Sequence, residues 1–285
     1  MSKLKIAIQK SGRLNEDSLK LLKNSGIAIN NGKDQLKMIV DNFPLEIFYL
    51  RNSDIPQYLE DGTVDIAIVG ENLLIEKQKQ VEIVQKLGFS KCKVSLAVPK
   101  EVEDDSINYF NGKKIATSYP VTLQAYLDKN NIKAEIHTIS GSVEIAPNIG
   151  LADGICDIVS SGSTLFKNGL RETQVILKSQ AVLVKSLQLN EEQEEILSKL
   201  LFRINAVIRA KNSKYILLNV PNEKIEAVTN ILPVLKSPTI LPLAEKGWSS
   251  LHSVINENKF WDVIDELKAK GAEDILIVPI DKMVI

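Results

Sequence analysis

Short apolar segments alternate with helical segments along most of the chain, and no other pattern in the sequence restricts the fold as strongly. The run at residues 4–9 predicts a strand, and the pattern at residues 15–24 predicts a helix after a short break. Farther on, Asp54 as a cap and Pro56 in the first turn favour another helix, and residues 64–69 form a short apolar run. Strands that are apolar throughout are typical of parallel sheets covered on both faces, so an α/β architecture is expected.

The same pattern restarts after about residue 90 and predicts a second α/β lobe. Its expected elements are strands at residues 94–98, 114–117, 134–139 and 156–159 and helices at residues 122–130 and from residue 164. An extended run at residues 174–184 would return to the first lobe. We therefore expect a first lobe at residues 1–90 with a return segment at 178–211, and a second lobe at residues 91–177. Open α/β sheets bind ligands at the carboxyl ends of their strands, so a ligand cleft is expected between these lobes.

A long amphipathic helix at residues 190–211 links this core to a third region at residues 212–285. The third region predicts strands at residues 215–220, 239–243, 248–255 and 274–280 and helices at residues 223–231 and 259–270. Strand, helix, strand, strand, helix, strand is the order of a ferredoxin-like domain.

The formal net charge of -1 gives no field that would attract nucleic acid, so an anionic ligand must be held by local basic residues. The first ten residues place a charge inside every short apolar run, and no segment approaches membrane-spanning length. Cys92 and Cys156 lie far apart without metal-type spacing, which is typical of a reducing compartment. The sequence therefore predicts a cytoplasmic protein that binds neither nucleic acid nor membranes.

The clearest candidate site is the segment from Asp157 to Thr164, at the end of an expected strand. A turn of small hydroxylated residues around one glycine presents backbone amides and the positive end of a helix to a phosphate group. Asp157 sits where a ribose hydroxyl or a metal-bound water would be held. A Ser/Gly-rich connector has the same sequence form, so the segment taken alone leaves both interpretations open. The residues that would form the loop are Ser160, Ser161, Gly162, Ser163 and Thr164.

A second candidate anion site lies where the first strand feeds the first helix. Lys10 and Arg13 supply positive charge there, beside Gly12. Glu71 and Glu144 each follow an expected strand, which places two carboxylates near the same surface. Taken singly, Lys10 and Arg13 are more commonly solvated surface cations, and Glu71 and Glu144 are more commonly surface or capping carboxylates.

The chain also excludes several mechanisms. Two histidines, His137 and His252, cannot form a histidine-rich metal site, and no nucleophile with partners for a catalytic triad can be assembled. Cys156 falls in an apolar strand and is expected to be a packed core thiol, and Cys92 is also expected to be structural. Neither a Walker A motif nor a dinucleotide glycine fingerprint occurs, so a bound ATP would be held by other means.

Five blocks of sequence give nearly the whole chain a resemblance to a known family. They lie at residues 8–14, 54–72, 114–120, 141–147 and 150–171. The last block, GLADGICDIVSSGST followed by NGLR, is the most specific. The chain resembles the ATP phosphoribosyltransferase family in its long form, which opens histidine biosynthesis.

The resemblance implies two catalytic lobes like those of periplasmic binding proteins and a ferredoxin-like (ACT-like) C-terminal domain that binds histidine as a feedback inhibitor. It also implies a homohexamer built from dimers and dependence on Mg²⁺. The implied reaction joins the ribose of phosphoribosyl pyrophosphate to N1 of ATP and gives phosphoribosyl-ATP and pyrophosphate.

The resemblance also implies roles for single residues. Asp157, Glu144 and Lys10 would act in catalysis. The residues that would bind the two substrates are Gly12, Arg13, Arg51, Glu71, Ser160, Ser161, Gly162, Ser163 and Thr164. The residues that would contact histidine are Thr239, Leu241 and Ala272. No protein ligand for Mg²⁺ is indicated, because the pyrophosphate of the substrate is expected to hold most of the ion. Ser161 and Ser163 stand where relatives often have threonine and alanine, a departure that leaves the backbone cradle intact.

Two other functions fit parts of this pattern. A solute-binding module uses the same two-lobed cleft without chemistry, but the sequence shows no export signal and carries the hydroxyl-rich loop. A catalytically inactive regulatory subunit is the third hypothesis, and the intact segment at residues 157–164 disfavours it.

Overall fold

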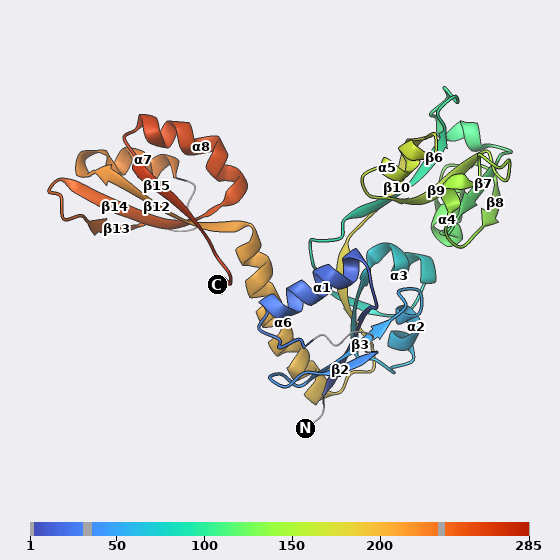
Figure 1. Cartoon of the computed structure of the whole chain (residues 1–285), viewed down its shortest axis with the longest axis horizontal. Helices are drawn as coiled ribbons and strands as arrows, with labels where there is room; N and C mark the ends of the chain where they lie inside the picture. Colours follow the sequence, from blue (N-terminus) through green and yellow to red (C-terminus); the bar gives the residue numbers. More distant parts are fainter. Residues whose placement is uncertain (1–2, 31–35, 233–236, 285) are drawn as a thin grey trace. The chain divides into compact units, whose positions relative to one another are not determined.

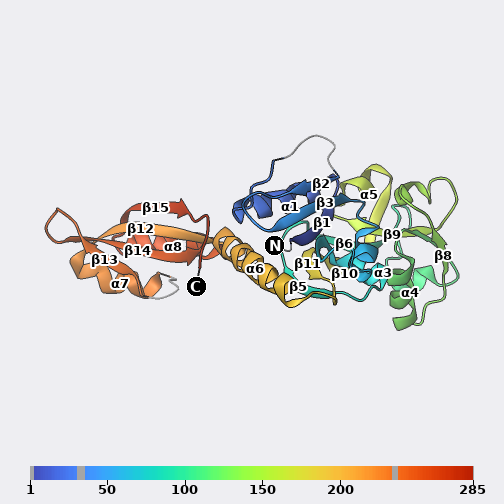
Figure 2. The same ribbon diagram turned by 90° about the horizontal axis from the view of Figure 1, so that it is seen from below.

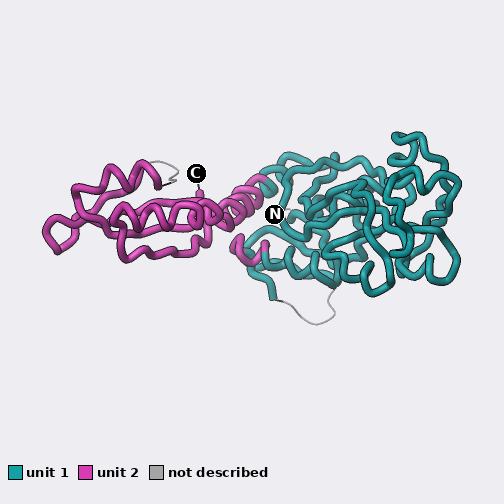
Figure 3. The backbone as a smooth tube through the Cα atoms, turned by 90° about the horizontal axis from the view of Figure 1, so that it is seen from above, with its two compact units in different colours: residues 1–20, 27–197 teal, residues 21–26, 198–285 magenta. Residues whose placement is uncertain are grey.

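The computed structural model describes residues 3–30, 36–232 and 237–284. Its contacts divide the chain into two compact units, which Figure 3 shows in different colours. The larger unit comprises residues 1–20 and 27–197, and the smaller comprises residues 21–26 and 198–285. Within the described residues, no helix combines the length and the apolar character needed to cross a lipid bilayer.

The first sheet of the larger unit has the strand order β2-β3-β1-β4-β11-β5. Its strands are β1 Leu4–Gln9, β2 Lys37–Ile39, β3 Leu45–Leu50, β4 Ile66–Gly70, β5 Glu82–Lys86 and β11 Ala181–Lys185. Strand β1 runs parallel to β3 and β4, whereas β11 pairs antiparallel with β4 and β5. The late strand β11 therefore returns to the first sheet, whereas residues 174–179 of the expected extended run belong to a strand of the second sheet.

Three helices belong with this sheet, and we call sheet and helices together the first lobe (Figure 1). They are α1 Arg13–Asn24, α2 Ile55–Glu60 and α3 Glu71–Lys77. Pro56 lies in the first turn of α2, where its missing N–H costs nothing. Asp54 occupies the N-cap position of α2, as expected, but its side chain makes no capping hydrogen bond and instead accepts one from the Ser53 hydroxyl.

The second sheet of the larger unit has the order β10-β6-β9-β7-β8. Its strands are β6 Cys92–Pro99, β7 Lys114–Thr117, β8 Glu135–Thr138, β9 Gly154–Val159 and β10 Leu170–Ser179. The helical segments between them are η1 Ile107–Phe110, α4 Pro120–Lys129, η2 Val143–Ile145 and α5 Ser163–Lys167. We call this sheet with its helices the second lobe. Strand β7 is parallel to β8 and β9, whereas β6 is antiparallel to β9 and β10.

Gly154 shows how tightly the second sheet is packed at the start of β9. A Cβ atom at this position would lie 2.7 Å from Cε1 of Phe110 and 2.9 Å from the carbonyl oxygen of Ala97. Phe110 is fully buried, so it has no room to move away. Only glycine fits here.

Two segments of chain cross between the lobes. Residues 87–91 lead from β5 to β6, and Gln180 separates β10 from β11. The chain thus leaves the first sheet, completes the second and comes back, which is the two-lobed α/β arrangement that the sequence predicted.

The smaller unit contains a four-stranded antiparallel sheet of order β13-β14-β12-β15. Its elements, with the long helix that precedes them, are α6 Glu191–Lys211, β12 Ser213–Pro221, η3 Asn222–Lys224, α7 Ile225–Ile231, β13 Thr239–Pro242, β14 Trp248–Asn256, α8 Glu257–Ala269 and β15 Glu273–Pro279. Ile216 and Leu218 of β12 pack in one cluster with Val228 of α7 and Leu267 of α8. Both helices therefore cover the same face of the sheet (Figures 1 and 2), as in a ferredoxin-like domain.

Candidate active site

The hydroxyl-rich loop directly follows β9, and α5 begins at Ser163. Gly162 has a φ of 76°, which places the loop in a left-handed conformation that glycine adopts without strain. Within the described residues, none of the backbone amides from residue 161 to residue 165 donates a hydrogen bond to the protein. The side-chain oxygens of Ser161 and Ser163 lie 3.1 Å apart. The loop is a cup of unsatisfied donors, which is the arrangement that binds a phosphate group.

Asp157 lies on β9 just before this loop. Its Oδ1 accepts a hydrogen bond of 2.7 Å from the amide of Ile158, and Oδ2 has no hydrogen-bond partner among the described residues. Burial raises the pKa of the Asp157 carboxyl, and the negative charge of Glu144 raises it further. The structure therefore brings together two of the residues that the sequence singled out, Asp157 and Glu144, beside the cup.

Tyr119 borders the same region. Burial raises the pKa of its hydroxyl, and the charge of Asp157 adds to this effect, so the phenol stays neutral. The neighbouring Cys156 is fully buried, which raises its thiol pKa to about 12. The prediction of a packed core thiol is confirmed for Cys156.

The basic candidates lie on the first lobe, at the carboxyl ends of parallel strands. The amide of Lys10 donates a hydrogen bond of 2.8 Å to the carbonyl of Leu50, so the loops after β1 and β3 are neighbours and Arg51 lies next to the Lys10 loop. Lys10, Arg13 and Arg51 are exposed and make no ion pair within the described part of the chain. Gly12 has a φ of 86° at the turn between them, which favours glycine.

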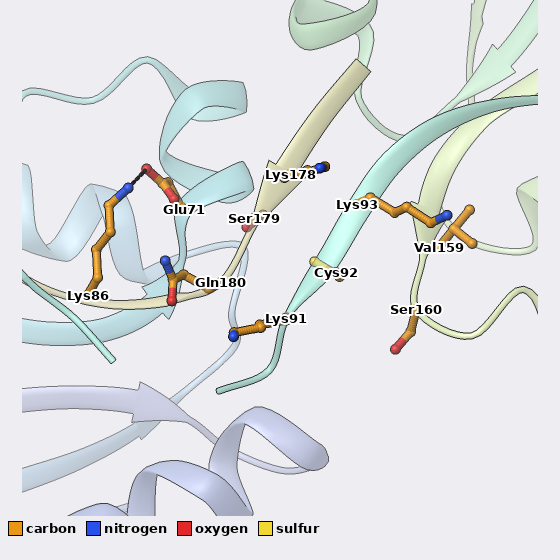
Figure 4. A pocket seen from close by; sticks show the side chains of 10 residues that line it. All are labelled: Glu71, Lys86, Lys91, Cys92, Lys93, Val159, Ser160, Lys178, Ser179 and Gln180. Atoms are coloured by element: carbon orange, nitrogen blue, oxygen red, sulfur yellow. Dashed lines mark ion pairs between the residues drawn. The ribbon is translucent and has the colours of Figure 1, made fainter. Parts of the chain in front are cut away.

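A pocket of about 450 Å³ lies where the chain crosses between the two lobes (Figure 4). It is lined by Glu71, Lys86, Lys91, Cys92, Lys93, Val159, Ser160, Lys178, Ser179 and Gln180. Of the predicted site residues, Glu71 of the first lobe and Ser160 of the second lobe meet here. The other predicted residues do not line this pocket.

Four lysines of this pocket were missed by the sequence analysis. Two of them are paired: Lys86 lies 3.4 Å from the Glu71 carboxylate, and Lys93 lies 2.5 Å from Glu172. Lys91 and Lys178 make no ion pair among the described residues, so their charges are available to an anionic ligand. The close spacing of Lys86, Lys91 and Lys93 around a crossing segment was a signal that could have revealed these three, but not Lys178.

The predicted histidine contacts are spread over the C-terminal sheet. Thr239 and Leu241 are exposed on β13, whereas Ala272 is buried directly before β15. Strands β13 and β15 form opposite edges of the sheet, with β14 and β12 between them. Three strand spacings amount to about 14 Å, so one copy of the domain does not join these residues in one small pocket.

No group of three or more histidine, cysteine, aspartate or glutamate side chains in the described residues could hold a metal ion. Asp157 and Glu144 offer two carboxylates at most. Since Mg²⁺ prefers six oxygen ligands and commonly takes several from substrate phosphates, the residues present fit an ion that arrives with its substrate.

Two family models match the chain. The HisG model, described as ATP phosphoribosyltransferase, matches residues 51–206, and the model of the HisG C-terminal domain matches residues 210–282. The ATP phosphoribosyltransferase of Cytophaga hutchinsonii is 57% identical over 281 residues, which cover 99% of this chain and 98% of the relative. The chain belongs to the ATP phosphoribosyltransferase family. The ATP phosphoribosyltransferase of Bacteroides thetaiotaomicron is 51% identical over 282 residues, 99% of this chain and 100% of that relative.

Solved structures agree with this ATP phosphoribosyltransferase assignment. A chain of the ATP phosphoribosyl transferase (HisG:HisZ) complex from Thermotoga maritima matches with a TM-score of 0.63 and 29% identity, covering 73% of this chain and 98% of that one. The periplasmic sulfonate-binding protein SsuA from Methylobacillus flagellatus matches with a TM-score of 0.50 and 17% identity, covering 72% and 67% of the two chains. The second likeness shows only the fold, and it confirms the periplasmic-binding-protein-like architecture of the two lobes.

Proposed function

We propose that this member of the family transfers the 5-phosphoribosyl group of phosphoribosyl pyrophosphate to N1 of ATP, releasing pyrophosphate, as the first step of histidine biosynthesis. The observation that carries the proposal is the cup of free amides at residues 161–165 beside the Asp157 carboxylate. The cup suits the 5-phosphate of a phosphoribosyl donor, and Oδ2 of Asp157, on the strand that leads into the cup, is available to accept a hydrogen bond from a ribose hydroxyl.

The chemistry needs few protein groups. Adenine N1 already has a free lone pair, so no base is needed to generate the nucleophile. The difficult event is loss of pyrophosphate from an anomeric carbon that becomes cation-like. Alignment of the two substrates lowers the activation free energy by ~7 to 11 kcal/mol in favourable cases, and preorganised charges lower it further.

In this proposal the second lobe stabilises the sugar. The amides of residues 161–165 bind the 5-phosphate, and the carboxylates of Asp157 and Glu144 face the developing positive charge on the ribose. Burial, together with the negative charge of Glu144, already raises the pKa of Asp157, and a cationic neighbour would be stabilised by both carboxylates.

The first lobe and the crossing segments supply positive charge for the polyphosphates. Lys10, Arg13 and Arg51 have no ionic partners among the described residues, and the same is true of Lys91 in the pocket. Gly12 lets the Lys10 loop turn sharply beside them. Mg²⁺ bound to the pyrophosphate would neutralise the leaving group, with Asp157 and Glu144 as the residues of this chain that could contact it.

The test mixes the purified protein with ATP, phosphoribosyl pyrophosphate and Mg²⁺ and measures pyrophosphate release together with formation of phosphoribosyl-ATP. Release that requires both substrates supports the proposal. Binding of either substrate without turnover would instead favour the solute-binding function that the fold also permits.

Cys92 provides a chemical probe of the pocket. Saturating phosphoribosyl pyrophosphate with Mg²⁺ should slow alkylation of Cys92 by iodoacetamide several-fold, because the thiol lines the pocket beside Ser160. Burial raises the pKa of Cys92, so a smaller fraction of this thiol is ionised than in a free cysteine at the same pH. Because the thiolate is the form that reacts, alkylation is best followed at pH 9. Mass spectrometry gives the rate at each cysteine, and buried Cys156 is the internal control, unmodified until urea is added. If saturating phosphoribosyl pyrophosphate left the alkylation rate of Cys92 unchanged, binding of this substrate in the pocket would be contradicted.

The regulatory part of the proposal concerns the C-terminal domain. Histidine would bind near Thr239, Leu241 and Ala272 and favour an inactive assembly of a cytoplasmic hexamer built from dimers. Because Thr239 and Ala272 belong to opposite edges of one sheet, a site that uses both requires the edges of two copies of the domain.

A further inference from the structure

Glu76, on the last turn of α3 in the first lobe, contacts the start of α4 in the second lobe. Its Oε1 accepts a hydrogen bond of 3.0 Å from the amide of Val121. Its Oε2 accepts two more, of 2.9 Å from the amide and 2.8 Å from the hydroxyl of Thr122. A single side chain of one lobe therefore satisfies two of the unpaired amides that begin a helix of the other lobe.

Burial and the positive end of α4 strengthen the hydrogen bonds of Glu76. Glu76 is only 9% exposed and forms no ion pair with a lysine or arginine among the described residues. Its negative charge is compensated by the positive end of α4 and by three donors, so each of these bonds is charge-assisted. Breaking the contact would leave a carboxylate and two amides without partners, which is unfavourable in a buried position.

Helix α3 is attached at its other end as well. The hydroxyl of Ser179, at the end of β10, donates to Asn72 Oδ1 at 2.8 Å and accepts from the Asn72 amide at 3.0 Å. Asn72 Nδ2 also lies 3.4 Å from the hydroxyl of Tyr119 in the second lobe. A Cβ at Gly70 would lie 2.5 Å from Asn72 Oδ1, so glycine there leaves space for this attachment.

We propose that Glu76 is a positioning residue that holds the two lobes at one fixed angle. Rotation of the lobes about residues 87–91 and Gln180 would pull α3 away from α4 and break all three bonds of Glu76. The angle sets the distance between the basic loops of the first lobe and the phosphate cup of the second. This inference rests on the proposed function, because a reaction between two substrates held on different lobes needs that distance.

The direct test is Glu76→Ala in the full chain, assayed for pyrophosphate release. We expect the KM values for ATP and phosphoribosyl pyrophosphate to rise about 10- to 100-fold, the loss expected for hydrogen bonds to a charged group. Affinity for ribose 5-phosphate, which needs only the cup of the second lobe, should stay within about twofold of the original. A purely structural role would instead weaken ribose 5-phosphate binding in step with stability.

A distance measurement tests the lobe angle without catalysis. Spin labels at Asp41→Cys and Lys129→Cys, two exposed positions on different lobes, are compared by pulsed electron resonance in a Cys92→Ala background. Glu76→Ala should broaden the distance distribution and shift it to a new mean. Lys77→Ala, an exposed neighbour on the same helix, is the matched control and should leave the distribution unchanged.

Milder variants keep the inference testable if Glu76→Ala does not fold. Thr122→Val removes only the hydroxyl donor and should raise both KM values about 3- to 10-fold, and Thr122→Ser should restore them. Unchanged distances and KM values in these variants would overturn the role of Glu76. Failure of the unmodified chain to release pyrophosphate would refute the proposed function instead, whatever the distances show.

Discussion

Replacing Asp157 with asparagine should lower kcat for pyrophosphate release by at least about 10²-fold without lowering the free energy of unfolding. The substitution removes the negative charge that faces the cation-like ribose in the proposed reaction. Asparagine keeps the shape and can still accept the 2.7 Å hydrogen bond from the Ile158 amide. The local backbone therefore has no reason to change.

The expected stability follows from the direction of the pKa shift. Burial and Glu144 raise the pKa of Asp157 in the folded protein, so folding favours its protonated form. The contribution of this carboxyl to the free energy of unfolding is complete when the pH is below its pKa in the unfolded chain. That contribution is lost as the pH rises through its pKa in the folded protein. At pH 7 the ionised group opposes folding, and a neutral asparagine should leave the free energy of unfolding equal or higher.

Asp153→Asn is the matched control in the same lobe. Asp153 Oδ2 accepts a hydrogen bond of 2.8 Å from the amide of Lys114, and its other oxygen lies 3.6 Å from Lys113. This variant should lose some stability in urea and keep its turnover, the opposite of the Asp157 variant. An Asp157→Asn protein that retains kcat within threefold would remove Asp157 from the catalytic machinery.

Removing residues 212–285 should abolish histidine binding, because every predicted contact with the inhibitor lies in this segment. The segment has its own hydrophobic core, which includes Ile216, Leu251, Phe260 and Leu267. The two sheets of the catalytic lobes contain no strand from it. Isothermal titration should give no binding heat for a chain that ends at Lys211, while the full chain binds.

The truncated chain also separates regulation from catalysis. Its pyrophosphate release should persist and become insensitive to histidine. Thr239→Ala in the full chain is a smaller change that should weaken inhibition and leave uninhibited turnover unchanged. Undiminished histidine binding by the truncated chain would place the inhibitor site outside the C-terminal domain.

Much of the fold was predictable because its central strands and longer helices carry strong local patterns. The expected strand at residues 4–9 and the expected helix at residues 190–211 agree with β1 and α6 to within one residue. The sequence analysis missed β3, although its residues alternate regularly between buried and half-buried. Three other missed elements have weak patterns. Strand β5 is an edge strand with exposed and half-buried residues, β2 has three residues, and α3 has seven, so none shows a clear period.

The candidate site could be proposed from the sequence where one continuous segment forms it, as with Asp157 and the loop that follows. It was not predictable where tertiary pairing forms it. Lys178 lies directly opposite Lys93 in the β10–β6 ladder, although the two are far apart in the sequence. Likewise, Glu76 meets Val121 and Thr122 only because the lobes fold against each other. No local pattern reports such long-range neighbours.

The return of β11 to the first sheet determines the order in which the lobes can be completed during synthesis. All five strands of the second sheet lie between Cys92 and Ser179, so they have left the ribosome before β11 appears. Strand β5 borders only β11 in its sheet and has no ladder partner until then. The nascent first lobe therefore exposes an unpaired edge beside β4 while the second lobe already has every strand it needs.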